Sequence, residues 1–186
     1  MANHNGADAL KRYYFLRAFV SAAWVVAAFT IGAANPLIGG VLLVLYPAWD
    51  ALANARDAAS NGGFKANVPQ AFNTVVSALV ALGVLIALRV DQPLVLVLFG
   101  AWAVLAGVLQ LAAGVRRWRT YGAQWAMILS GAQSALAGGF FVSKAAAPIA
   151  APLVTVIAPY AAFGAFYFLV SAIVLTVKGR RVARTA

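Results

Sequence analysis

The chemistry available to this sequence rests on very few ionisable side chains. The 186 residues include four acidic residues, all aspartates, no cysteine and a single histidine. Two of the aspartates, Asp50 and Asp57, stand at the ends of an i, i+4, i+7 series that has Asn54 in the middle. In a helix, side chains with this spacing share one face. This polar stripe could form a structural ion pair, or it could relay protons or a solute.

Arg17 is the expected partner of the polar stripe. It lies 19 residues before Pro36, whereas Asp50 and Asp57 follow Pro36 by 14 and 21 residues. In a pair of antiparallel helices these depths match well enough for the long arginine side chain to reach either carboxylate. Gln110 has the position equivalent to Asp57 in a later part of the chain and could join the cluster.

Three interpretations of this cluster stay open. The first is an internal ion pair that fixes helix packing, and the second is a proton or solute relay. In the third, the second span ends early and leaves Arg56 and Asp57 in water. Pro47 lies close by, and a proline inside a helix removes a backbone hydrogen bond and bends the axis. The segment around Asp50 is therefore expected to have a special shape.

The missing residue types exclude several functions. Without cysteine the chain has no disulfide and no thiolate metal site, and His4 stands alone in a polar leader. Nucleophilic catalysis needs histidine, cysteine or converging carboxylates. We therefore expect no enzyme activity, no catalytic residue, no cofactor and no metal site. The net charge is +10, but the basic residues form short clusters between apolar segments, so nucleic acid is not an expected partner.

The composition places the chain in a lipid bilayer. Hydrophobic residues make up 64% of it and charged residues 10%, whereas soluble domains have about 45–50% and about 25%. A helix needs about 20 apolar residues to cross the membrane, and lipid offers no partner to unpaired backbone groups, which favours an all-α fold. Six spans are predicted: Tyr13–Ala34, Leu37–Ala58, Gln70–Leu88, Leu94–Val115, Ala123–Val142 and Pro159–Val177.

The basic residues predict the direction of these spans. Twelve of the 14 lysines and arginines lie on one side: before or at the start of the first span, or at the end of an even span and in the segment after it. The other side has only Arg89 and Lys144. The positive-inside rule then places both termini in the cytoplasm.

Three tandem hairpins organise the predicted membrane domain, which covers residues 1–186. Odd-numbered spans end near Pro36, Pro93 and Pro148, with separations of 57 and 55 residues. Internal repeats of this kind predict copies at about 12–65, 66–120 and 121–181. Each copy would be one helical hairpin.

Small residues mark the fifth span as a packing element. One series with a spacing of four contains Ser130, Ser134 and Gly138, and a second contains Gly131, Ala135 and Gly139. Small residues on one face allow another helix to approach closely. The fifth span is therefore expected at the centre of the bundle or at an oligomer interface.

The segment from Ala101 to Leu111, followed by basic Arg116 and by residues 125–148, resembles the short repeat of the HdeD-like acid-resistance membrane proteins. The resemblance implies a bacterial inner-membrane protein associated with acid or envelope stress, and it supplies no catalytic residues. The chain departs from the pattern in its polar second span and in a longer connection, Ala145–Ala158, before the sixth.

Two classes of function follow. The first is a structural or stress-protection protein that works as a homo-oligomer or as a subunit of a larger membrane complex. The alternative is a transporter or channel for a small solute or protons that uses Asp50. A dry pair with Arg17 would favour the first class, and a cavity at Asp50 open to one side would favour the second.

Overall fold

The chain is helical throughout the part that the structure describes. This computed structural model describes residues 2–116 and 124–185, and the side chains of 9–112, 115 and 128–177. The elements are α1 (Ala2–Ala27), η1 (Ala28–Gly32, a π-helical continuation of α1), α2 (Pro36–Ser60), α3 (Val68–Val90), α4 (Gln92–Arg116), α5 (Gln124–Ala145) and α6 (Leu153–Thr185). The all-α prediction is confirmed.

Several of these helices are suited to a bilayer. Among the described residues, five segments are long and apolar enough to cross a membrane: Ala9–Gly32, Pro36–Ser60, Val68–Val90, Gln92–Ala112 and Leu153–Val177. Their outer faces carry large apolar side chains, such as Phe19, which is 72% exposed, and Leu37, which is 77% exposed. Arg17 and Ser77, by contrast, are buried. Lipid favours apolar side chains on the outside of a bundle and its few ionisable groups on the inside.

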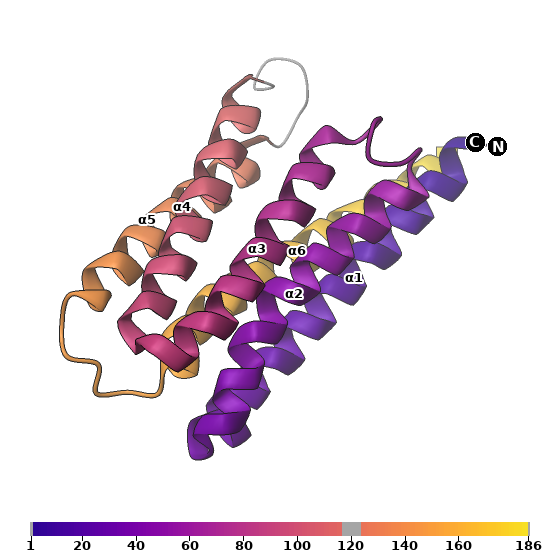
Figure 1. The fold of residues 1–186 in the computed structure, drawn as a ribbon. Helices are drawn as coiled ribbons and strands as arrows, with labels where there is room; N and C mark the ends of the chain where they lie inside the picture. Colours follow the sequence, from indigo (N-terminus) through magenta and orange to yellow (C-terminus); the bar gives the residue numbers. More distant parts are fainter. Residues whose placement is uncertain (1, 117–123, 186) are drawn as a thin grey trace.

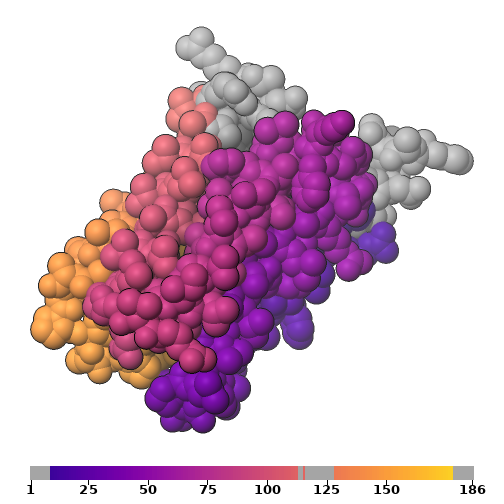
Figure 2. All heavy atoms as spheres, viewed as in Figure 1, coloured from indigo at the N-terminus to yellow at the C-terminus, as the bar shows by residue number. Residues whose placement is uncertain are grey.

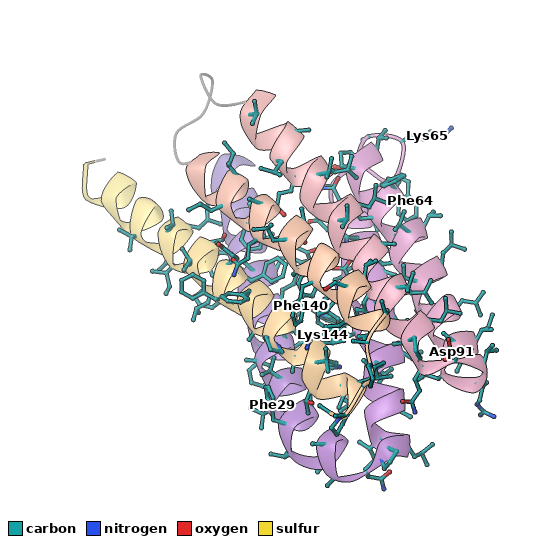
Figure 3. The ribbon with its side chains drawn as sticks, turned by 90° about the vertical axis from the view of Figure 1, so that its left-hand side faces the viewer. Phe29, Phe64, Lys65, Asp91, Phe140 and Lys144 are labelled. Carbon is teal, nitrogen blue, oxygen red and sulfur yellow. The ribbon has the colours of Figure 1, made fainter. Side chains whose placement is uncertain are left out.

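The helices run up and down between two ends of the bundle (Figure 1). Both chain termini lie at one end, called here the termini end, where α2 and α4 finish and α3 and α5 begin. The opposite end, called the proline end, holds Pro36, Pro93 and the connection 146–152. Figure 3 shows Lys65 and Asp91 at opposite ends, and Phe29 pointing away from the bundle.

Each helix has a preferred neighbour, and for none of the six α-helices is this neighbour its partner in a predicted hairpin. The most extensive contacts join α4 to α5, α2 to α3 and α1 to α6, and α3 also packs on α4. On the face seen in Figure 2, α3 lies between α2 and α4. By contrast, α1 meets α2 mainly through η1, and α5 makes few contacts with α6.

Local sequence explains how α2 begins and ends. The Asn35 side chain accepts hydrogen bonds from the amides of Leu37 at 2.9 Å and Ile38 at 3.3 Å, and Pro36 occupies the first turn, where no donor is needed. At the other end Gly62 and Gly63 have φ of 94° and 84°, a conformation that glycine adopts without strain.

The sixth helix begins earlier than the sequence predicts. It starts at Leu153 and carries Pro159 in its second turn, whereas Pro159 was expected to open the span. Pro152 performs that role, since its carbonyl accepts the Thr155 amide at 2.9 Å. The connection is therefore 146–152 instead of the expected Ala145–Ala158, and Pro148 lies within it. Pro159 leaves one carbonyl of the first turn without its helical donor, which is cheap near a helix start.

Glycines set the distance between α4 and α5. A Cβ atom built on Gly107 would lie 2.5 Å from the Gly131 carbonyl oxygen, and one on Gly138 would lie 2.5 Å from that of Gly100. Nothing lies within 4 Å of the corresponding position on Gly139. The packing face of α5 is thus the Gly131–Gly138 side, against α4, and Gly139 faces away from it.

Candidate functional site

A cavity of about 990 Å³ lies inside the bundle and is lined by residues from all six α-helices. Toward the termini end its wall includes Asp57 in the last turn of α2 and Pro69 in the first turn of α3. Deeper inside, Tyr46, Trp102 and Tyr160 line it. Polar side chains on several helices complete the wall: Asn54, Gln70, Asn73, Gln110, Ser130, Gln133, Ser134 and Ser171.

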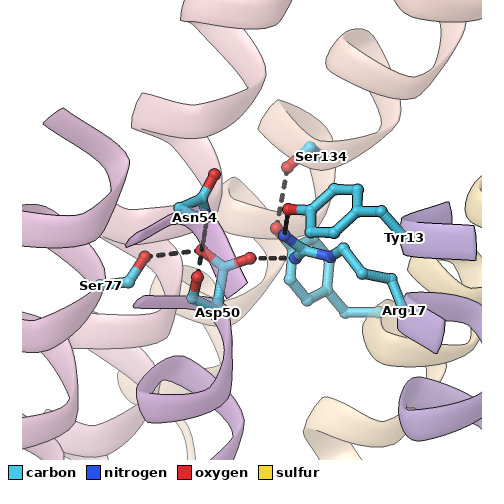
Figure 4. A network of polar contacts seen from close by, with 7 residues as sticks. Tyr13, Arg17, Asp50, Asn54, Ser77 and Ser134 are labelled. Carbon is cyan, nitrogen blue, oxygen red and sulfur yellow. Dashed lines mark hydrogen bonds and ion pairs between the residues drawn. The ribbon is translucent and has the colours of Figure 1, made fainter. Parts of the chain in front are cut away.

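The charged centre of this wall is an ion pair between Arg17 on α1 and Asp50 on α2 (Figure 4). It joins Nη2 of Arg17 to Oδ1 of Asp50, as the matched depths of the two residues along the chain predict. The two side chains are 11% and 19% exposed. Because α1 and α2 make few direct contacts outside η1, this pair bridges the space between them.

Neighbouring donors hold the second oxygen of the Asp50 carboxylate. Ser77 on α3 donates to Oδ2 at 2.8 Å, and the Asn54 side-chain amide donates to the same oxygen at 3.0 Å. Asn54 also donates to the Asp50 carbonyl at 2.8 Å. Three donors from three helices therefore fix the carboxylate, which is what a buried charge requires.

Aromatic rings surround the Arg17 guanidinium. Its Cζ atom lies 4.3 Å from the centre of the Phe168 ring and 5.7 Å from that of Tyr13, and the Tyr13 hydroxyl accepts a hydrogen bond from Nη1 at 3.0 Å. Tyr14 stacks on Phe168 with ring centres 6.1 Å apart. Buried Nε of Arg17 has no partner among the described residues.

Asp57 sits in a different environment, one turn from the end of α2. Its carboxylate accepts the side-chain amides of Gln70 at 3.1 Å and Asn61 at 3.0 Å. The helix α2 continues past Asp57 to Ser60, and the third interpretation, a membrane span that ends before Asp57, stays a hypothesis.

A chain of aromatic contacts forms the floor of the cavity. Tyr46 contacts Phe99 and Trp102 at centroid distances of 6.5 and 5.8 Å, Trp102 contacts Tyr160 at 6.3 Å, and Tyr160 contacts Phe141 at 6.0 Å. Below these rings, buried residues of the same helices, among them Leu43, Leu96 and Ile157, pack together. Tyr46 and Trp102 each follow the first residue of their helix by ten positions, which places this aromatic floor about 15 Å from the proline end.

The fifth and sixth helices supply a second set of polar contacts. Ser134 donates to the Ala103 carbonyl at 2.9 Å and lies 3.1 Å from the Tyr160 hydroxyl. The Tyr167 hydroxyl donates to Gln133 at 3.0 Å. Ser134 thus lines the cavity and contacts α4 at the same time, so it is more than a small packing residue.

The structure collects most of the predicted polar residues around this one cavity. Arg17, Asp50 and Asn54 are in direct contact, whereas Asp57 belongs to a separate cluster with Gln70. Gln110 lines the cavity, but no hydrogen bond joins it to Asp57 within the described part of the chain. Sequence reasoning missed the roles of Tyr13 and Ser77. Ser77 lies four residues after Asn73, a polar spacing inside an apolar span that could have indicated an inward face.

Comparison with known protein families, with curated proteins and with solved structures finds no match to this chain.

Proposed function

We propose that this chain is a non-enzymatic membrane protein that binds a small solute in its central cavity and works as a transporter or channel. The observation that carries the proposal is the cavity of about 990 Å³ with Asp50 and Arg17 in its wall. Drug-sized ligands occupy pockets of about 300–1,000 Å³.

The proposed setting is the inner membrane of a bacterium, with six passes, three repeat copies and both termini in the cytoplasm. The distribution of basic residues supports this orientation. The cavity, whose wall reaches the last turn of α2 and the first turn of α3, would then be entered from the cytoplasmic side.

For a solute to pass from the cavity to the opposite side of the membrane, the rings of the aromatic floor must move apart. Two helix-interior prolines lie directly beside its tyrosines, since Pro47 follows Tyr46 and Pro159 precedes Tyr160. A proline removes one backbone hydrogen bond and makes bending at that point easier. We propose that bending of α2 and α6 at these residues moves the two tyrosines apart.

Cysteine accessibility tests whether the cavity holds water and opens to one side. The chain has no cysteine, so Ser130→Cys and Ser171→Cys each introduce a single thiol into the cavity wall. We expect both to react with a membrane-impermeant methanethiosulfonate in inside-out vesicles and to resist it in right-side-out vesicles.

Leu79→Cys is the matched control, because Leu79 is 63% exposed on the outer surface and would face lipid, where the reactive thiolate does not form. If Ser130→Cys and Ser171→Cys react no faster than Leu79→Cys, the cavity is dry and the proposal is wrong.

A second candidate is the structural, stress-protecting role that the HdeD-like resemblance implies, in a homo-oligomer or a larger complex. The low exposure of the Arg17–Asp50 pair favours it, since a mostly buried pair resembles a packing device. This role predicts dry behaviour in the labelling experiment and loss of acid survival on deletion of the gene.

A further inference from the structure

The wall of the cavity has a loosely closed seam between α5 and α6. These two helices make few contacts with each other, and long side chains bridge the space between them. The Tyr167 hydroxyl donates to Gln133 at 3.0 Å, and the Tyr160 hydroxyl lies 3.1 Å from that of Ser134. All four residues line the cavity. Such hydrogen bonds contribute little net stability, because polar groups of water or of a ligand can replace them, so the seam is easy to open.

The outer rim of this seam is apolar. Leu136 and Phe140 on α5 and Phe163 on α6 line the cavity and are also exposed on the outside, by 75%, 49% and 49%. Phe140 is two residues from Gly138, so it projects from the side of α5 that is turned away from α4, and Figure 3 shows it toward α6. The cavity therefore reaches the outer surface of the bundle at apolar side chains.

This lateral opening lies at the depth of lipid hydrocarbon. Leu136 precedes the last residue of α5 by nine positions, and Phe163 follows the first residue of α6 by ten. At about 1.5 Å per residue, both lie about 14–15 Å from the proline end. In a bilayer with a hydrocarbon layer about 30 Å thick, this is near the middle. The molecules next to an opening at this depth are the acyl chains of lipids.

Nearer the termini end the same cavity has a polar wall. Gln110 on α4 and Ser171 on α6 each follow the first residue of their helix by 18 positions, which places them about 27 Å from the proline end. Asn73 also lines the cavity, in the second turn of α3, which begins at the termini end. Lipid heads lie near this depth, and their chains lie at the depth of the lateral opening. The wall of the cavity thus follows the polarity of one leaflet.

We infer that the cavity binds a membrane lipid, which enters sideways between α5 and α6. Its head lies among the polar groups near Gln110 and Ser171, and one hydrocarbon chain lies in the seam. The inference rests on the proposed solute-binding function and names the class of its solute. A wholly polar solute would not cross the apolar rim, and a wholly apolar one would leave the polar groups of the wall without partners.

A photoreactive lipid tests the inference on the unchanged protein. Phosphatidylcholine with a diazirine in the middle of one acyl chain is incorporated into nanodiscs with the protein and irradiated, and mass spectrometry locates the labelled residues. We expect labels on Ala106 and Tyr160, which line the cavity, as well as on Leu79, which is exposed on the outer surface. Labels confined to outward-facing residues such as Leu79 would overturn the inference.

A reversible cross-link tests the route of entry. The chain has no cysteine, so Gln133→Cys/Tyr167→Cys places two thiols at positions that face each other across the seam. A bifunctional methanethiosulfonate joins them before the probe lipid is added. We expect labelling of Ala106 and Tyr160 to be lost, labelling of Leu79 to stay, and a reductant to restore the lost labels. Gln133→Cys alone, treated with the same reagent, is the matched control and should keep the inner labels.

Three further outcomes decide between the alternatives. Inner labels that persist in the cross-linked protein would show another route of entry, and a disulfide between two copies of Leu136→Cys would show that a second chain covers the seam. Either result overturns the inference. If inner labels are absent but Ser130→Cys and Ser171→Cys react with the impermeant reagent, the cavity binds a solute other than lipid. If those cysteines are also unreactive, the proposed function falls with the inference. Each variant's thermal unfolding midpoint shows that it is folded.

Discussion

Arg17 and Asp50 show how a membrane helix can carry a charge at moderate cost. Each charge alone in the bilayer would be unfavourable by about 2.5–3.5 kcal/mol on insertion scales. Here the guanidinium has a carboxylate, a tyrosine hydroxyl and an aromatic face as partners. The carboxylate in turn is held by Ser77 and Asn54. The pair is stable only as a unit, because each partner removes the cost of burying the other.

The stability of variants of this pair is therefore expected to be strongly non-additive. Asp50→Ala should lower the free energy of unfolding by about 3 kcal/mol, because it leaves the Arg17 charge without its carboxylate. The double variant Arg17→Ala/Asp50→Ala should lose clearly less than the sum of the single losses. Thermal or denaturant unfolding in mild detergent measures this difference. Asp57→Ala is the control, since it removes the contacts to the Asn61 and Gln70 amides and leaves the Arg17–Asp50 pair in place. Strictly additive losses at Arg17 and Asp50 would contradict the expectation.

At the scale of the helices, the sequence predicts where helices lie along the chain better than it predicts which helices pack together. Apolar runs and Pro36 predict where α2 begins, and matched depths predict that Arg17 meets Asp50. The α1–α6 and α4–α5 pairings could not be predicted, because lipid-facing and helix-facing positions are equally apolar. The contact of Gly131 and Gly138 with α4 depends on shape alone. Because α5 carries two overlapping series of small residues, the sequence does not show which face of α5 packs against its neighbour. The cavity was also beyond prediction, since it depends on where helices fail to touch.

Adjacent glycines on α5 provide a matched test of helix packing. A methyl group on Gly138 would lie 2.5 Å from the Gly100 carbonyl oxygen and 2.7 Å from the Val104 amide nitrogen. Because these are backbone atoms, Gly138→Ala must push α4 and α5 apart, at a cost of about 1–3 kcal/mol. Gly139→Ala meets no atom within 4 Å and should be neutral or slightly stabilising. Equal unfolding midpoints for the two variants would show that α4 and α5 are not packed through this face.

At the scale of the whole molecule, the alternation of basic and nearly neutral connections predicts how the protein is oriented in the membrane. Single cysteines that replace Lys65 and residue 185 would lie at the termini end. Cysteines that replace Arg89 and Ala150 would lie at the proline end. In intact cells we expect an impermeant maleimide to label only Arg89→Cys and Ala150→Cys, because the basic end faces the cytoplasm. Labelling of residue 65 or 185 in intact cells would reverse or refute this orientation. Disruption of the cells should expose all four positions.

The aromatic floor has an electrical consequence. If water from the termini side fills the cavity down to Tyr46 and Trp102, the electrical potential of that compartment extends down to these rings. Most of the membrane voltage then falls across the packed layer of about 15 Å between the floor and the proline end. A charged solute held in the cavity above the floor would therefore bind with little dependence on voltage. Its passage beyond the floor would involve nearly the full energy of about 2.3 kcal/mol per charge at 100 mV, so flux, but not affinity, should respond to the membrane potential.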